Sequence, residues 1–126
     1  MSTEETKARQ RAAVLCCIRM GKDLANTRHW IAMHTGLNDR NVRERIEELR
    51  NEGHLICNLQ DGNGYFLAEN EEDIEQQYLQ DYARAMSILK RMKPFRHALR
   101  EAETADLDQV TMTELLKEAL TDGSDI

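Results

Sequence analysis

Residues 27–68 carry the pattern that decides the fold: TRHWIAMHTGLNDRNVRERIEELRNEGHLICNLQDGNGYFLA. Thr27 and Asn38 are residue types whose side-chain oxygens cap the N-termini of helices. Gly36 lies between them and permits a tight turn. The stretch therefore predicts a short helix from Thr27 to about His34, and a second helix from Asp39 to Asn51.

The remainder of this stretch changes from helical to β character. In the second helix Val42, Ile46 and Leu49 form one apolar stripe, and Gly53 follows the helix end. Residues 54–59 and 65–68 then have strand composition, and the Asp-Gly-Asn-Gly run between them is a dense turn signal. The pattern predicts one β-hairpin.

Helices are expected on both sides of this stretch. Before it, residues 5–20 predict a helix that ends near Gly21, with an apolar stripe of Ala8, Ala12, Leu15 and Ile18. After it, Asn70 caps a helix over residues 71–92, whose acidic first turn suits the helix dipole. Pro94 is expected to break that helix or to start the next one. The predicted fold class is mainly α with one β-hairpin.

Three helices followed by a hairpin is the element order of a winged helix-turn-helix. The chain resembles this domain of bacterial repressors, such as the N-terminal domain of the biotin operon repressor, and also small phage or prophage winged-helix proteins. The residues that carry the resemblance are Ile31-Ala32, Thr35-Gly36-Leu37, Asn38, Val42-Arg43, Ile46, Leu49, Gly53, Gly64-Tyr65 and Leu67. The resemblance implies a winged-helix domain over residues 1–69. A helical extension (70–103) and an acidic tail (104–126), with a short helix at Glu114 to Leu120, would follow it.

The resemblance implies a non-enzymatic protein that binds double-stranded DNA. A helix fits the major groove when a second helix braces it, and its outer face then reads base edges. Because Val42, Ile46 and Leu49 face the core, helical phase predicts that the opposite face contacts DNA. The predicted DNA-contacting residues, including those placed to hold phosphates, are Thr27, Arg28, Asn38, Arg40, Asn41, Arg43, Glu44 and Arg45. A role in transcription regulation or in a phage-type DNA transaction follows.

Two features favour an alternative interpretation. Glu44, Glu47 and Glu48 interleave with the arginines, so the helix face can equally be a solvated, salt-bridged surface. The expected wing tip, residues 59–63, contains Asp61 and no Lys or Arg. The alternative is a phage replication or adaptor protein that binds a host protein through the winged helix or the acidic tail.

The chain has a net charge of -6, which is distributed in blocks. Residues 69–83 contain six acidic side chains and no Lys or Arg, whereas residues 84–100 contain six Lys or Arg and no acid. This pattern suits an antiparallel homodimer of the long helix. The predicted dimerisation residues are Ile74, Tyr78, Tyr82, Ala85, Leu89 and Met92. In the alternative, this stripe packs back on the winged domain.

The end of the chain is strongly acidic. Residues 101–126 hold eight acidic side chains and one Lys. They can pair with the basic segment that contains Lys90, Arg91, Lys93, Arg96 and His97. Otherwise this segment serves as an auxiliary phosphate-binding patch. Apolar residues at helical spacing in the tail can instead dock on a partner protein.

Other classes of site find no support in the sequence. No phosphate-binding glycine loop, metal-ligand spacing or catalytic constellation is present, so we expect no cofactor, no metal and no enzyme. Cys16, Cys17 and Cys57 are predicted to be reduced, partly buried thiols. Trp30 is expected on the domain surface or against the long helix. The chain lacks a signal-like start and a membrane-length apolar run, which predicts a soluble cytoplasmic protein.

Overall fold

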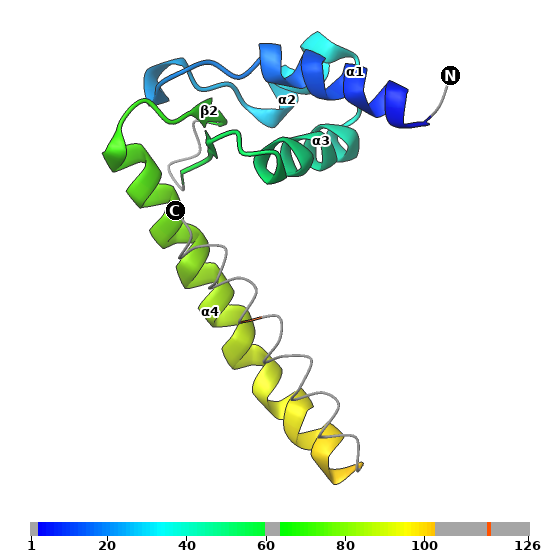
Figure 1. Ribbon diagram of the computed structural model, residues 1–126, viewed down its shortest axis with the longest axis vertical. Helices are drawn as coiled ribbons and strands as arrows, with labels where there is room; N and C mark the ends of the chain where they lie inside the picture. Colours follow the sequence, from blue (N-terminus) through cyan, green and yellow to red (C-terminus); the bar gives the residue numbers. More distant parts are fainter. Residues whose placement is uncertain (1–2, 60–63, 103–115, 117–126) are drawn as a thin grey trace. The chain divides into compact units, whose positions relative to one another are not determined.

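The computed structural model describes residues 3–59, 64–102 and Leu116 (Figure 1). Its elements are α1 (Thr3–Cys16), the short 3-10 helix η1 (Lys22–Leu24), α2 (Arg28–Thr35), α3 (Asp39–Asn51), β1 (Ile56–Cys57), β2 (Phe66–Leu67) and α4 (Glu71–Glu101). The predicted fold class, mainly helical with one hairpin and a long C-terminal helix, is confirmed. The chain divides into two compact units, Met1–Tyr82 and Ala83–Ile126.

The predicted caps begin the helices of the first unit. The Thr27 hydroxyl accepts a hydrogen bond from the Trp30 amide at 3.1 Å, and the Asn38 side chain accepts one from the Asn41 amide at 2.7 Å. Between the two helices Gly36 adopts φ 77°, the left-handed conformation that glycine enters without steric cost. Local side-chain chemistry therefore sets the turn between α2 and α3.

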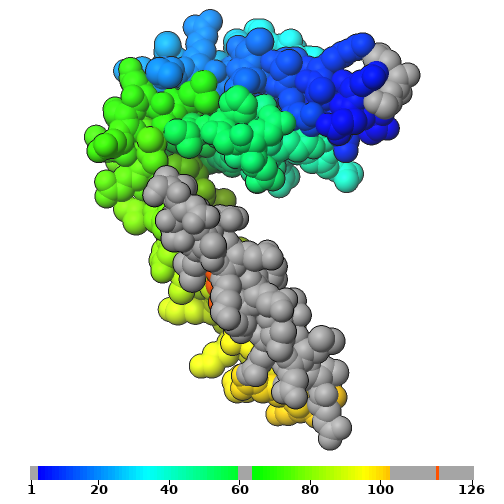
Figure 2. All heavy atoms as spheres, viewed as in Figure 1, coloured from blue at the N-terminus to red at the C-terminus, as the bar shows by residue number. Residues whose placement is uncertain are grey.

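The core of the first unit lies where α1, α2 and α3 meet the hairpin. It is built from Val14, Ile18, Ile31, Val42, Ile46, Leu49, Ile56 and Tyr65. In Figure 2 the spheres of α1 and α3 meet in one continuous surface. The apolar stripe predicted for α3 is confirmed, because all three of its residues are buried.

The predicted apolar stripe before Gly21 is confirmed in its second half only. Ile18 is buried and Leu15 packs against the core, but Ala8 and Ala12 are exposed, and Val14, outside the stripe, is buried. The helix ends at Cys16 rather than near Gly21. The physical reason is a polar contact, since Arg11 faces α3. Its guanidinium donates to the Glu48 carboxylate at 2.9 Å and lies 3.3 Å from that of Glu52. Tertiary ion pairs set the orientation of this helix, and a stripe of apolar residues could not reveal them.

The hairpin is shorter than predicted and is tied to the segment between α1 and α2. β1 pairs antiparallel with β2, with Ile56 opposite Leu67 and Cys57 opposite Phe66. On its other side, the amide of Tyr65 donates to the Asn26 carbonyl at 2.8 Å, and that of Leu67 donates to the Arg19 carbonyl at 2.7 Å. Partners on both sides therefore hold the second strand in place.

Asn70 begins α4 as predicted, because its side chain accepts a hydrogen bond from the Asp73 amide at 2.9 Å. The buried Asp73 in turn accepts one from the Glu69 amide at 3.0 Å, so the two side chains cap the helix reciprocally. The expected break at Pro94 is wrong, since the helix continues to Glu101. Proline's fixed φ is itself helical, and it removes only one hydrogen bond from the helix.

Three further predictions concern cysteines, membranes and the tail. All three thiols are free, Cys57 is buried and Cys17 is half-buried, but Cys16 is exposed because it faces away from the side that buries Val14. None of the helices in the described ranges combines the length and apolarity needed to span a bilayer. The expected wing tip at residues 59–63, except Leu59, lies outside the described residues. The expected tail helix at Glu114 to Leu120, except Leu116, lies outside them as well.

Candidate nucleic-acid interface

The N-termini of α2 and α3 lie beside each other. The Arg28 guanidinium, in the first turn of α2, pairs with the Asp39 carboxylate in the first turn of α3. Hydrogen bonds with Asp39 and then with Tyr65 raise the pKa of Arg28 above its ordinary value. The pair is exposed to solvent and brings together the capped ends at Thr27 and Asn38. Helix N-termini present free backbone amides and a positive dipole end, which suits phosphate.

The outward face of α3 carries two of the predicted arginines. The Arg40 side chain is 85% exposed and lies 3.1 Å from the Glu44 carboxylate, one turn later. Arg43 is exposed and forms no ion pair with any described residue. Asn41 is half-buried, between this face and the core side of the helix. Arg40, Arg43 and Glu44 form the accessible surface of α3, together with Glu47.

The predicted exposure of Arg45 is wrong. Arg45 is only 3% exposed and donates to the Gln10 side chain of α1 at 3.0 Å. It also lies 3.2 Å from the Glu44 carboxylate and 3.1 Å from that of Glu48. The reason is helical phase, since Arg45 precedes the buried Leu49 by four residues and therefore lies on the same side of α3. Arg45 joins α1 to α3 and does not face the outside.

Arg50 has a comparable structural role. Its guanidinium donates to the Ile56 carbonyl and to the Asn58 side chain, each at 3.0 Å, and pairs with Glu47 at 3.0 Å. Arg50 also lies 5.9 Å from the centre of the Tyr65 ring. It therefore holds α3 to the hairpin. Among the arginines of α2 and α3, those accessible for binding are Arg28, Arg40 and Arg43.

Sequence reasoning placed Trp30 on the surface but missed its pairing. The Trp30 and His34 rings stack with their centres 3.6 Å apart, and the His34 Nδ1 lies 2.9 Å from the Trp30 carbonyl oxygen. Trp30 remains 37% exposed. The i,i+4 spacing of two aromatic rings on one helix is the signal that could have identified this pair.

The residues predicted for dimerisation lie along α4. Ile74, Tyr78, Tyr82 and Ala85 are exposed, and Leu89 and Met92 are half-buried. Ile74, Tyr78 and Tyr82 belong to the first unit, but their side chains are exposed. The alternative that this part of the stripe packs into the core of that unit is therefore wrong. Polar side chains attach the start of α4 instead: the Asn58 amide donates to Gln77 at 2.8 Å, and Gln80 donates to the Asn58 carbonyl at 3.1 Å.

Other kinds of site are absent from the described part of the chain. No group of three His, Cys, Asp or Glu side chains within it is arranged to hold a metal ion. Comparison with known proteins gives no further guidance: no family model matches the chain, and neither does any curated protein or solved structure.

Proposed function

We propose that this chain is a non-enzymatic winged helix-turn-helix protein that binds double-stranded DNA in the cytoplasm. The observation that carries the proposal is the junction of the two capped helix ends at the Arg28–Asp39 pair, beside the exposed Arg40 and Arg43. The element order of three helices followed by a hairpin supports it. The sequence resemblance to bacterial repressors and phage proteins supports it as well.

Different groups contact the phosphates and the base edges. Backbone amides at the start of α2 and α3, together with Arg28, hold phosphates, while Arg40 and Arg43 reach guanine edges or flanking phosphates in the major groove. The ion pairs that Arg28 and Arg40 form with acidic side chains oppose DNA binding only weakly. An exposed ion pair contributes only about 0–1 kcal/mol, so Arg28 and Arg40 can leave Asp39 and Glu44 for a denser anion.

The test is fluorescence anisotropy of labelled random-sequence duplex, titrated with the full chain at low and at physiological salt. For non-specific binding to phosphates, the logarithm of the association constant falls linearly with the logarithm of the salt concentration. The slope is set by the number of phosphate contacts. The double variant Arg40→Ala/Arg43→Ala should weaken binding at least tenfold. Arg9→Ala/Arg19→Ala removes two exposed arginines outside α2 and α3 and serves as the matched control, with little effect expected beyond the loss of charge.

Equal losses in the double variant and in the control would show that net charge, not the α3 face, governs binding. Absence of binding even at low salt would overturn the proposal.

The ion pairs on α3 favour a second candidate, a phage replication or adaptor protein that binds a host protein. Glu44 touches both Arg40 and Arg45, and Glu47 pairs with Arg50, so the outward face carries acids as well as bases. In the adaptor, Leu115→Ala/Leu116→Ala in the acidic tail would abolish capture of the host partner. The Arg40→Ala/Arg43→Ala variant would leave duplex affinity unchanged.

A further inference from the structure

α4 carries a regular apolar seam that no described core explains. Residues spaced alternately by four and by three lie on one side of a helix, which is the repeat of a coiled coil. In α4 this series is Ile74, Tyr78, Asp81, Ala85, Ile88, Met92, Phe95 and Leu99. Seven of the eight residues are apolar, and the series continues over three and a half heptads. We name this series the α4 seam.

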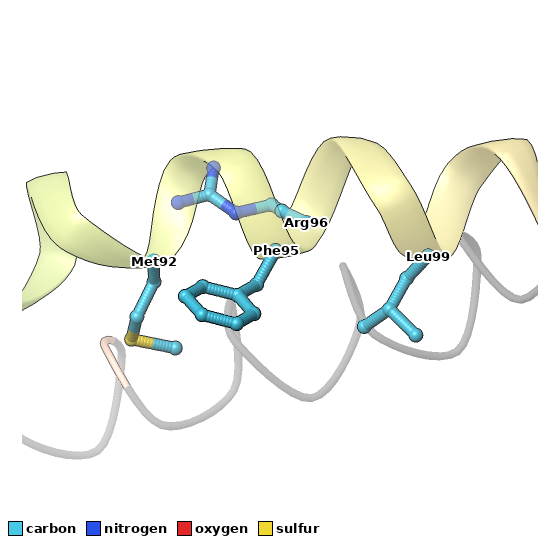
Figure 3. Close-up of a pocket in the computed structure, with 4 residues that line it drawn as sticks. All are labelled: Met92, Phe95, Arg96 and Leu99. Atoms are coloured by element: carbon cyan, nitrogen blue, oxygen red, sulfur yellow. The ribbon is translucent and has the colours of Figure 1, made fainter.

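The side chains of the seam are accessible along its length. Tyr78 is 64% exposed and Phe95 is 71% exposed, and Ile74, Ile88 and Leu99 are exposed as well. In Figure 3 the side chains of Met92, Phe95 and Leu99 extend from the same side of the helix, where they line a hollow together with Arg96. Large apolar side chains on one exposed helix face mark an interaction surface.

The charges along α4 indicate which partner binds the α4 seam and in which direction that partner runs. The seam begins in the acidic block, residues 69–83, and ends in the basic block, residues 84–100. A second copy in parallel would place the two acidic blocks together and would set Asp81 against the partner's Asp81. A second copy in antiparallel orientation sets each acidic block against a basic one, which steers pairing and excludes the parallel form.

We propose that α4 pairs with α4 of a second copy of this chain in an antiparallel coiled coil. The spacing of the seam is symmetric about the midpoint between Met86 and Ser87, so one register matches every position. In that register Ile74 lies opposite the partner's Leu99, and Tyr78 lies opposite the partner's Phe95. Ala85 lies opposite the partner's Ile88.

The one polar seam residue fits this register. Asp81, which accepts a hydrogen bond from Gln77 at 3.1 Å, lies opposite the partner's Met92. Lys93 and Arg91 flank that position in sequence, so the carboxylate lies among basic side chains. With the proposed DNA-binding function, the pairing supplies two α3 helices for two half-sites. The pairing itself does not depend on that function.

The first test is the mass of the full chain in solution without DNA, by sedimentation equilibrium at tens of micromolar. The expected mass is twice 14.6 kDa. The double variant Ile88→Glu/Phe95→Glu should sediment at the mass of one chain, because it places four acids in the seam of a dimer. Ala83→Glu/His97→Glu adds the same number of acids at exposed positions on the opposite side of α4, and this matched control should remain a dimer. Circular dichroism verifies that each variant keeps its helices.

The second test fixes the direction of the pairing by oxidative cross-linking, in a background with Cys16→Ser and Cys17→Ser. In the antiparallel register Tyr78→Cys lies opposite the partner's Phe95→Cys, so the two single variants cross-link when they are mixed and neither cross-links with itself. In a parallel pairing each variant cross-links with its own copy. We expect rapid cross-linking only in the mixture.

Three results would overturn the proposal. A wild-type chain that sediments as one copy would assign the seam to this chain's own tail or to another partner. A dimer that survives Ile88→Glu/Phe95→Glu would place the interface elsewhere. Cross-linking of Tyr78→Cys with its own copy would show the parallel form. Because DNA is absent, none of these results bears on duplex binding.

Discussion

At the scale of single residues, the arginines of α3 differ in role because of helical phase. Arg43 and Arg45 are two positions apart, but one is exposed and the other is buried between α1 and α3. A buried guanidinium must have partners, and Arg45 has Gln10, Glu44 and Glu48. Residue type alone therefore does not identify a nucleic-acid contact.

The first prediction compares these two arginines. Arg45→Ala should lower the free energy of unfolding by about 2–3 kcal/mol, because it leaves partly buried carboxylates without their partner. Arg43→Ala, on the open face, should change it by less than about 0.5 kcal/mol. Urea unfolding followed by circular dichroism measures both. Equal stabilities of the two variants would contradict the structural role given to Arg45.

The second prediction concerns the thiols. Burial raises the pKa of Cys57, with Asp73 adding to the effect, so less reactive thiolate forms there at neutral pH. Cys16 is exposed. A thiol reagent at pH 8 should label Cys16 first and should reach Cys57 only when the protein unfolds. Mass spectrometry of the labelled peptides gives the order, and early labelling of Cys57 in the folded protein would contradict its burial.

At the scale of elements, local chemistry was predictable and tertiary polar contacts were not. The caps at Thr27, Asn38 and Asn70 follow from side chains that bond to their own helix, so the sequence identifies them. The face of α1 depends on Arg11 meeting Glu48, 37 residues away, and no local pattern reports that pairing. For the candidate site, Arg28 and Arg40 are accessible as expected, whereas the contact between Arg28 and Asp39 required the fold.

The third prediction tests a cap. Asn38→Ala removes the hydrogen bond to the Asn41 amide and should destabilise the protein by about 1 kcal/mol. Asn38→Ser keeps a capping oxygen and should lower the stability of the protein much less. Thermal unfolding of both variants measures the difference. An Asn38→Ala protein as stable as the serine variant would show that the cap contributes nothing.

The fourth prediction compares two glycines with positive φ. A Cβ atom at Gly64, φ 103°, would lie 2.3 Å from the Asn26 carbonyl oxygen, where the strand approaches the neighbouring segment. At Gly53, φ 108°, nothing lies within 4 Å of that position. Gly53→Ala should therefore cost about 1–2 kcal/mol through backbone conformation alone. Gly64→Ala should cost clearly more, as measured by chemical unfolding; similar losses would contradict the close approach.

At the scale of the whole molecule, two surfaces account for two proposed activities. The α2–α3 junction in the first unit offers helix ends and arginines to a polyanion. The α4 seam offers apolar residues, flanked by opposite charges, to a second copy. The overall charge of -6 conceals both surfaces, because acids and bases are segregated along the chain. Local charge, and not net charge, is the relevant guide to partners here.

Amide chemical-shift mapping of the full chain, as duplex DNA is added, tests DNA binding through the α2–α3 junction most directly. We predict that the largest shifts fall on residues 27–30 and 38–44, at the start of α2 and along the outward face of α3. The shifts should weaken as salt is raised. Shifts confined to the basic half of α4, or none at all at low salt, would contradict DNA binding through the α2–α3 junction.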